Sequence, residues 1–329
     1  MLRRKHLTRR LFIGSLVALP FSNLPNVALA GQWPNKSVRV LYPYAAGSAG
    51  DVTARLFAQR LGEVFGQPFV VENRPGANGT LGVEAVARAP ADGYTLLWSP
   101  SPPITISPAM TALPYDPVKD LKPISAVALN TMALIVNAKT PITTVAELVS
   151  FVRQRPRQLT YAEGGIGSTN HLAMALLLNS AGLYMTNVSY RGSGPALNDV
   201  IAGHVPIMFS PLADLQPHIE SGAIRVLAVT SNQRSAYLPN VPTLNESGFP
   251  ALKVPAWSGL MAPAATPKPI IERLAAEVGR AIKDSKFAEQ LNRRGVEPLG
   301  TTPEELAAMI SGDIALWAEA VKIAGVQPK

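Results

Sequence analysis

The stretch Tyr44-Ala45-Ala46-Gly47-Ser48-Ala49-Gly50-Asp51 joins an apolar run, Val38–Tyr42, to a helical pattern that begins at Val52. Its small residues leave backbone N–H groups uncovered. Where a strand passes into a helix through such a loop, the first amides have no partner inside the helix and the helix dipole favours negative charge. The stretch therefore predicts an anion site built from backbone. It equally fits a tight turn in which Asp51 only caps the helix.

Two further loops rich in glycine and serine precede predicted helices. Gly164-Gly165-Ile166-Gly167-Ser168-Thr169 follows a short strand over 159–162 and leads into a helix over 170–181. Arg191-Gly192-Ser193-Gly194 follows a strand over 188–190 and leads into a helix that begins at Pro195. The pattern of the opening loop thus recurs in the other half of the chain.

Strands and helices alternate along the rest of the sequence. A long extended run covers 124–137, and capping-box patterns begin helices at Thr144 and Thr302. The loop that starts at Ser99 follows a strand over 94–98, and in a doubly wound sheet such strand ends line the ligand crevice. These patterns predict α/β lobes with mostly parallel sheets.

Residues 1–30 have the pattern of an export signal, with a basic head, an apolar run over 11–21 and the small-residue cleavage site Ala28-Leu29-Ala30. The run is too short to cross a membrane. Thr8-Arg9-Arg10-Leu11-Phe12-Ile13 matches the twin-arginine pattern, with an ordinary secretory signal as the alternative. Both predict a protein that leaves the cytoplasm for the periplasm.

Charge and cysteine content exclude several classes of partner and site. Five of the 30 basic residues lie in the signal, so 25 basic residues stand against 22 acidic ones in the rest, a net charge of +3. Such a charge predicts neither a nucleic-acid nor a membrane-surface partner. The absence of cysteine excludes disulfides, thiolate metal sites and a lipid-modified N-terminus. We expect a soluble, unanchored protein, and about 299 residues suit two lobes.

Catalytic and metal sites have weak support in the sequence. His171 lies three residues after Ser168, but no Gly-x-Ser-x-Gly elbow or orienting acid completes a hydrolase. His171 fits either a ligand contact or a helix-start residue that bonds nearby backbone. His204 and His218 lack metal-ligand spacing, and no complete nucleotide-binding loop is present. We therefore expect a protein without catalytic activity, metal or cofactor.

Many ordered motifs give the chain a family resemblance. It resembles the Bug family, the extracytoplasmic solute receptors of tripartite tricarboxylate transporters, from Val38 to about Gly325. The matching stretches are Tyr44 to Arg55, Val70-Val71-Glu72-Asn73-Arg74-Pro75-Gly76-Ala77, Asp92-Gly93-Tyr94-Thr95-Leu96, Leu113-Pro114-Tyr115-Asp116-Pro117, Tyr161 to Leu172, Tyr190-Arg191-Gly192-Ser193-Gly194-Pro195-Ala196-Leu197, Ala228-Val229-Thr230 and Asn240-Val241-Pro242-Thr243.

The resemblance implies a two-lobe periplasmic-binding-protein fold of type II, joined by two hinge strands. The first lobe would comprise residues 31–127 and 229–329, and the second residues 128–228. The implied function is to capture a small organic carboxylate and deliver it, as a monomer, to the permease subunits of a tripartite tricarboxylate-type transporter. A membrane sensor protein is the alternative partner, and an exported Ser/His hydrolase is a second alternative.

The resemblance also implies where the ligand binds. Backbone amides and hydroxyls of the loops would contact it from both lobes. The expected ligand-binding residues are Tyr44, Ala46, Gly47, Ser48, Ala49, Gly50, Asp51 and Ser99 in the first lobe, and Gly165, Ile166, Gly167, Ser168, Thr169, His171, Gly192, Ser193, Gly194 and Ser210 in the second.

This chain departs from the family pattern at two places. Ser48 places the hydroxyl of the opening loop earlier than is usual, and Ser210-Pro211 stands where an Asp is frequent. Both changes bear on which carboxylate is bound. Arg191 fits a ligand contact or a solvated side chain, and Trp257 fits a stacking contact or packing between the lobes.

Overall fold

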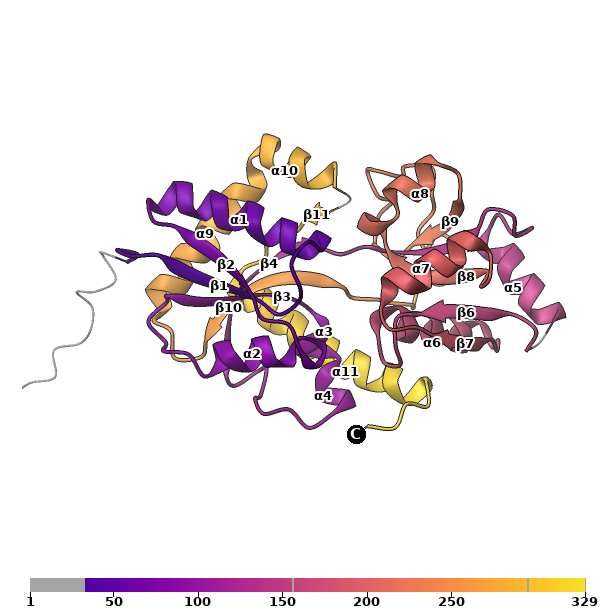
Figure 1. The fold of residues 1–329 in the computed structure, drawn as a ribbon, viewed down its shortest axis with the longest axis horizontal. Coiled ribbons are helices and arrows are strands. Elements are labelled where there is room, and N and C mark those ends of the chain that lie inside the picture. The colour runs from indigo at the N-terminus through magenta and orange to yellow at the C-terminus, as the bar shows by residue number, and fades with distance from the viewer. Residues whose placement is uncertain (1–32, 156, 295, 329) are drawn as a thin grey trace, which may run out of the picture.

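The computed structural model describes residues 33–155, 157–294 and 296–328. The expected export signal, residues 1–30, lies outside them. The described chain forms two α/β lobes side by side (Figure 1), as the sequence predicts. Each lobe has buried apolar clusters of its own. No described helix is both long and apolar enough to span a membrane.

The first lobe is built on a six-stranded sheet with the order β11-β4-β10-β3-β1-β2. Alternate residues face opposite sides: Val38 and Val40 pack on one face and Leu41 on the other. Both faces are apolar, so both need a covering layer. The strands are β1 (Val38–Tyr42), β2 (Phe69–Asn73), β3 (Thr95–Pro100), β4 (Leu121–Leu129), β10 (Trp257–Pro263) and β11 (Glu297–Pro298).

Helices cover both faces of this sheet. α1, α9 and α10 lie on one face, and α2, α3 and α11 on the other (Figure 1). The predicted capping box of α11 is confirmed, since Thr302 and Glu305 exchange hydrogen bonds. The helices are α1 (Ala49–Phe65), η2 (Ala77–Gly79), α2 (Thr80–Ala87), α3 (Pro102–Thr105), α4 (Ser107–Met110), α9 (Lys268–Lys283), α10 (Ser285–Asn292) and α11 (Pro303–Ile323).

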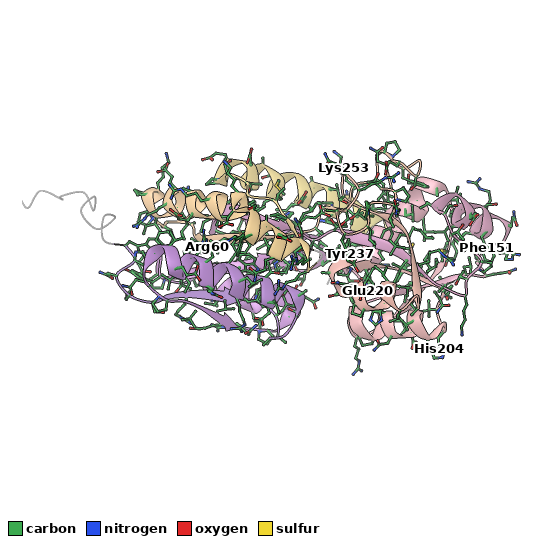
Figure 2. The ribbon with its side chains drawn as sticks, turned by 90° about the horizontal axis from the view of Figure 1, so that it is seen from above. Arg60, Phe151, His204, Glu220, Tyr237 and Lys253 are labelled. Atoms are coloured by element: carbon green, nitrogen blue, oxygen red, sulfur yellow. The ribbon has the colours of Figure 1, made fainter. Side chains whose placement is uncertain are left out.

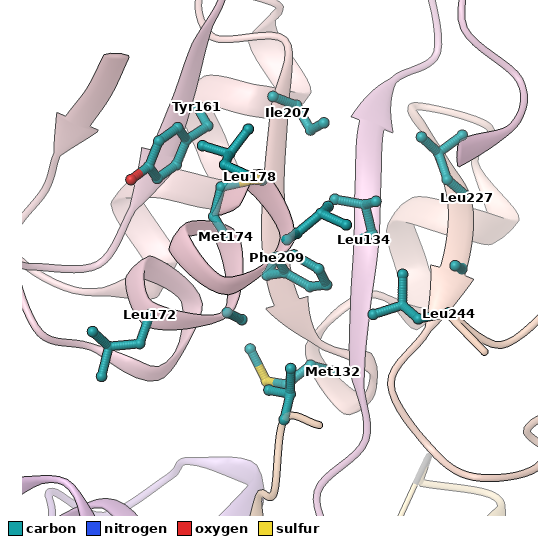
Figure 3. Close-up of a cluster of buried hydrophobic side chains, with 14 of the residues drawn as sticks. Met132, Leu134, Tyr161, Leu172, Met174, Leu178, Ile207, Phe209, Leu227 and Leu244 are labelled. Atoms are coloured by element: carbon teal, nitrogen blue, oxygen red, sulfur yellow. The ribbon is translucent and has the colours of Figure 1, made fainter. Parts of the chain in front are cut away.

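The second lobe contains a three-stranded sheet, β8-β5-β9, and a separate pair, β6-β7. Leu134 of the central strand packs with Phe209 and Met174 on one face (Figure 3), whereas Ile135 packs on the other. The elements are β5 (Met132–Asn137), α5 (Val145–Gln154), β6 (Thr160–Glu163), α6 (Thr169–Ala181), β7 (Thr186–Ser189), α7 (Ser193–Ala202), β8 (Ile207–Pro211), η3 (Leu212–Asp214), α8 (Gln216–Glu220) and β9 (Ile224–Val229).

Strand pairing differs from the expected mostly parallel sheets. The strands of the β-loop-α units pair in parallel, namely β1 with β2, β1 with β3 and β6 with β7. The pairs that involve β4, β5, β8, β9, β10 and β11 are antiparallel. β4 carries the chain out of the first lobe and β10 returns it, so these neighbours run in opposite directions. β5 and β9 are opposed in the second lobe for the same reason.

Two crossing segments lie against each other at the hinge. The extended run predicted over 124–137 is divided at Asn130 and Thr131 between β4 and β5. The Asn130 N–H donates to the Ala256 carbonyl (2.8 Å), and the Asn130 amide donates to Ser258 Oγ (2.9 Å). Because backbone and side chain both join the segments, the outgoing and returning chains form one hinge.

Residues 230–256 pack on the second lobe, although the family resemblance implied that they belong to the first. The Val229 N–H donates to the Pro242 carbonyl (3.0 Å) and the Leu244 N–H to the Val229 carbonyl (2.9 Å). Leu244 is buried beside Leu227 (Figure 3). The chain therefore wraps around the second lobe after β9 and rejoins the six-stranded sheet at Trp257.

Helix α11 contacts both lobes. Its first turns place Leu306 and Ile310 under the six-stranded sheet. Its last turns place Trp317 and Val321 in the apolar cluster that includes Leu172 of α6. This helix closes one side of the space between the lobes.

Candidate functional site

A cleft of about 1420 Å³ lies between the two lobes. The first lobe contributes the loop over 44–50 and the segment around α3 and α4. The second lobe contributes the loops over 164–169 and 192–193. Residues at the hinge and at the end of α11 complete its walls. We call residues 44–50 the first-lobe loop and residues 164–169 the second-lobe loop.

Ser48 caps α1 and fixes the exit of the first-lobe loop. Its backbone is extended (φ −73°, ψ 160°), and its Oγ accepts from the Asp51 N–H (3.2 Å). The Tyr42 hydroxyl lies 3.1 Å from the same Oγ. A Cβ on Gly50 would stand 2.4 Å from that hydroxyl, so close packing requires glycine there. The cap is therefore Ser48, and the prediction that Asp51 caps the helix is wrong.

Asp51 instead holds the first-lobe loop from behind. It is 3% exposed, and its carboxylate accepts from the Gly47 N–H (3.0 Å), the Asn73 amide (2.9 Å) and both ends of the Arg55 guanidinium (3.1 Å). Burial opposes its ionisation, but these hydrogen bonds and the Arg55 charge keep the pKa of Asp51 below its ordinary value. The Asn73 amide also donates to the Tyr44 carbonyl (3.0 Å). An ionised carboxylate thus organises this loop.

Neutral side chains organise the second-lobe loop. Asn170 Oδ1 accepts from the Ser168 hydroxyl (2.5 Å) and from the Gly164 N–H (3.3 Å). His171 Nδ1 accepts from the Gly167 N–H (3.0 Å), so this nitrogen carries no proton. Burial lowers the pKa of His171, although the nearby Glu163 charge acts in the opposite direction. The loop is therefore fixed by an amide and a neutral imidazole.

The loop over 192–194 packs directly against the second-lobe loop. The Asn170 amide donates to Ser193 Oγ (3.4 Å). A Cβ on Gly164 would lie 2.7 Å from the Ser193 nitrogen, which leaves room only for glycine. Glu163, which is fully buried, accepts from the Gly165 N–H (2.5 Å) and from Asn187 (3.3 Å). These contacts bring both loops to one edge of the second lobe.

Two helix starts face the cleft from opposite lobes. Ala49 and Gly50 begin α1, and Thr169 and Asn170 begin α6, and all four line the cleft. Within the described residues, none of their backbone N–H groups has a protein acceptor. Unpaired first-turn amides and the positive ends of two helix dipoles converge on one space, which suits an anion.

A family model described as the tripartite tricarboxylate transporter family receptor matches residues 53–326. The chain belongs to this family. It is 33% identical to Protein BugT of Bordetella pertussis over 302 residues, which cover 91% of this chain and 93% of BugT. The resemblance to Bug receptors is thereby confirmed.

Solved structures of receptors of this family are similar along about nine-tenths of this chain. Rpa4515 of R. palustris with adipate is 36% identical, with a TM-score of 0.80 over 90% of this chain and 100% of that one. MatC from Rhodopseudomonas palustris with bound malate is 31% identical, with a TM-score of 0.75 over 88% and 100%. The periplasmic binding protein BugD is 33% identical, with a TM-score of 0.76 over 90% and 100%. The family thus consists of solute-binding receptors.

In this receptor, twelve of the eighteen residues predicted to bind ligand line the cleft. Six do not. Gly47 and Asp51 support the first-lobe loop, and Ser99 is fully buried with its hydroxyl bonded to the Pro100 carbonyl (2.8 Å). Ser210 is 1% exposed, and its Oγ has no partner among the described residues. Ala46 and Gly194 are the other two. The lining residues are Tyr44, Ser48, Ala49, Gly50, Gly165, Ile166, Gly167, Ser168, Thr169, His171, Gly192 and Ser193.

Many residues of the cleft were not predicted from the sequence, and three of the residues missed at the site hold the loops or carry charge. Asn73 and Asn170 hold the two loops, and Asp214 lines the cleft. Asn73 stands inside a family motif and Asn170 follows the second-lobe loop directly, so both had a positional signal. Asp214 had none, because only the fold brings it to the cleft.

Two residues left open by the sequence are now placed. Trp257 is fully buried, and its indole N–H donates to Asp313 of α11 (2.7 Å), so it packs in the core. Arg191 is exposed and does not line the cleft. Among the described residues, neither forms part of the cleft surface.

The geometry offers little for catalysis. The Ser168 hydroxyl donates to Asn170, and the described residues show no hydrogen bond between Ser168 and His171. His171 Nδ1 is already occupied by the Gly167 N–H. In the part of the chain that the structure describes, no group of three or more His, Asp or Glu side chains is arranged to hold a metal ion.

Proposed function

We propose that this protein is an extracytoplasmic receptor that captures a small organic carboxylate between its lobes. It would then present the closed complex to the membrane subunits of a tripartite tricarboxylate-type transporter. Family membership supports this, as do the relatives that bind adipate and malate. The observation that carries the proposal is the pair of helix starts, at Gly50 and Thr169, that face one cleft from opposite lobes.

In this proposal the backbone supplies the positive potential. A ligand carboxylate would accept from the free amides of Ala49 and Gly50 and from those of Thr169 and Asn170. The hydroxyl of Ser48 lies at the first helix start and would add a donor, whereas the hydroxyl of Ser168 already donates to Asn170. The loops are already held by Asp51 and Asn170, so little ordering entropy would be lost on binding.

Closure would bring the two helix starts together around the ligand. The hinge lies where Asn130 bonds Ala256 and Ser258. Rotation about these few residues would shorten the distance across the cleft without disturbing either core. The ligand would then be shared by both lobes, and a membrane protein that contacts both lobes would recognise only the closed form.

The sequence pattern at the N-terminus fits the same proposal. An export signal over 1–30 would deliver the mature receptor to the periplasm. The partner there would be a permease, with a sensor protein as the alternative. Capture of membrane proteins by ligand-loaded receptor, compared with empty receptor, distinguishes the two.

Native mass spectrometry of the purified mature protein, followed by a thermal-shift panel of carboxylates, tests the ligand class. A bound carboxylate should raise the melting temperature by mass action. Gly50→Ala should weaken binding by about tenfold or more, because the added Cβ displaces the Tyr42 hydroxyl from the loop.

Gly279→Ala is the matched control, since apart from its chain neighbours and the backbone of its own helix no atom lies within 4 Å of the position of its Cβ. It should leave binding unchanged. A broad panel in which no carboxylate stabilises the protein would contradict the proposed function. Turnover of a carboxylic ester that is lost in Ser168→Ala would establish a hydrolase instead.

A further inference from the structure

The side chains that line the cleft are unusual for an anion site. Among the described lining residues there is no lysine and no arginine, and one carboxylate is present, that of Asp214. Among the described lining residues, positive potential comes from the two helix starts, whereas negative charge comes from a side chain. A ligand that carried only carboxylates would therefore be attracted to one part of the cleft and repelled from another.

Asp214 is held firmly in place. It ends η3, which follows β8 without a break. The Leu212 N–H donates to the Thr131 carbonyl at the hinge (2.9 Å), and Leu212 and Leu215 are buried at 1% and 0% exposure. The backbone beside Asp214 is thus anchored to the hinge and to the core of the second lobe.

The Asp214 carboxylate has no protein partner in the part of the chain that the structure describes. Within the described residues it makes no hydrogen bond and no ion pair, and it is exposed to the cleft. Nearby protein atoms nevertheless desolvate it in part, and this desolvation raises the pKa of Asp214. An unpaired, partly desolvated acid in a ligand cleft is a common sign of a binding role.

Asp214 also lies within electrostatic reach of the first-lobe loop. Burial raises the pKa of the Tyr42 phenol and the hydrogen bond with Ser48 lowers it, while the negative charges of Asp51 and Asp214 raise it further. The Tyr42 hydroxyl contacts Ser48 Oγ, which caps α1. A ligand bound at that helix start therefore lies in the field of Asp214.

We propose that Asp214 makes this receptor select carboxylates that also carry a hydrogen-bond donor, a hydroxyl or an ammonium group, over the same carboxylates without one. This rests on the proposed function, since the ligand's carboxylate is taken to bind at the helix starts. The donor would satisfy the Asp214 carboxylate through a charge-assisted hydrogen bond. A donor-free ligand would leave that acid desolvated and facing another anion.

Calorimetric titration with matched ligand sets tests the proposal. One set is succinate, malate and aspartate, and the other is glutarate, 2-hydroxyglutarate and glutamate. The wild-type receptor should bind a donor-bearing member about tenfold or more tightly than its donor-free parent. In Asp214→Ala this ratio should fall to about twofold, and the donor-free parent should bind at least as well as it binds the wild type.

Asp214→Asn separates the two kinds of donor. The amide oxygen still accepts from a hydroxyl but has no charge to pair with an ammonium, so the ammonium ligand should lose more affinity than the hydroxyl ligand. Glu220→Gln is the control, because Glu220 is an exposed acid of the same lobe, beside Tyr237 (Figure 2), and does not line the cleft. It should keep the wild-type ratio.

Two results would overturn the proposal. If the affinity ratio between donor-bearing and donor-free carboxylates were the same in wild type and Asp214→Ala, Asp214 would have no role in selection. The proposed function would remain intact. If no member of either set, nor of the broad carboxylate panel, bound the wild-type receptor, the proposed function would fall together with the role of Asp214.

Discussion

The first-lobe loop and the second-lobe loop present the same feature, the free amides at a helix start, but are held by different chemistry. An ionised carboxylate, Asp51, holds the first through Gly47, Asn73 and Arg55. A neutral amide and a neutral imidazole, Asn170 and His171, hold the second. The comparison teaches that a backbone anion site does not require one particular scaffold. In both loops a buried acceptor fixes the backbone while the first two amides of the helix stay free.

Removal of the Asp51 carboxylate, which holds the first-lobe loop, should have the largest effect on stability. Asp51→Ala leaves the Gly47 N–H and the Asn73 amide without their acceptor, and should lower the free energy of unfolding by about 2–4 kcal/mol. The Arg55 pair adds little, because that side chain is 49% exposed. Urea denaturation measures the change. Glu63→Gln, an exposed acid of the same helix, should stay within about 0.5 kcal/mol of wild type. Equal effects of the two variants would contradict a central role for Asp51.

Asn170, which holds the second-lobe loop, should contribute somewhat less to stability than Asp51 does. It should contribute strongly to ligand binding. Asn170→Ala removes the acceptor for Ser168 and Gly164 and the donor to Ser193. We expect a loss of about 1–3 kcal/mol in the free energy of unfolding and about tenfold in carboxylate affinity. Asn198→Ala on α7, an exposed position, is the control and should change neither quantity. Wild-type affinity in Asn170→Ala would show that the second-lobe loop does not need this amide.

Mild acid should distinguish the two loops. The pKa of His171 in the folded protein lies below its ordinary value of 6.5. As the pH falls, the unfolded chain therefore takes up a proton on this residue before the folded protein does. The unfolded state then binds more protons, so the free energy of unfolding should fall by up to about 1 kcal/mol from about pH 7 to about pH 5.5. The contribution of Asp51 persists in this range, because its lowered pKa is crossed only below 3.8. As the pH falls, protection of backbone amides from hydrogen exchange should decrease in residues 164–172 before it decreases in residues 44–51.

Two histidine variants test whether His171 causes the expected loss of stability in mild acid. His171→Gln should remove the mild-acid step, while His218→Gln, which does not alter the cleft lining, should keep it. A step that survives in His171→Gln would assign the pH dependence to another group. If both loops lost protection from hydrogen exchange at the same pH, the proposed difference between the charged Asp51 and the neutral His171 would be contradicted.

The smallest effect is expected at Arg191. The residue is exposed beside the loop over 192–194 and does not line the cleft. Arg191→Ala should therefore change carboxylate affinity by less than about twofold. Isothermal titration measures this, and a loss of about tenfold would show that a cationic side chain, and not the backbone alone, recognises the ligand.

Local structure could be predicted from the sequence where a single residue or a short motif determines it. Glycine and serine before an apolar helical pattern predicted the starts of α1 and α6, and the capping pattern at Thr302 predicted the start of α11. Family motifs then predicted two lobes. These features follow from short-range chemistry or from many ordered matches, so they can be read from a linear sequence.

Features that depend on packing between distant segments could not be predicted in the same way. The antiparallel pairs follow from how the chain crosses the hinge, and the wrapping of residues 230–256 depends on contacts of Leu244 with the second lobe. The sequence offered Asp51 as the cap of α1, and only the loop geometry assigns the role to Ser48. Asp214 reaches the cleft through the path of η3, which no local pattern marks.

The most direct test of the account is an NMR titration that follows backbone amides while a carboxylate ligand is added to the isotopically labelled mature protein. The amide signals of Gly50 and Thr169 should both move, and both should saturate at the same ligand concentration, because one anion is held by helix starts of opposite lobes. Amides of α9, such as that of Gly279, should stay in place. Movement at only one of the two helix starts, or at neither while the ligand binds, would contradict the two-lobe anion site.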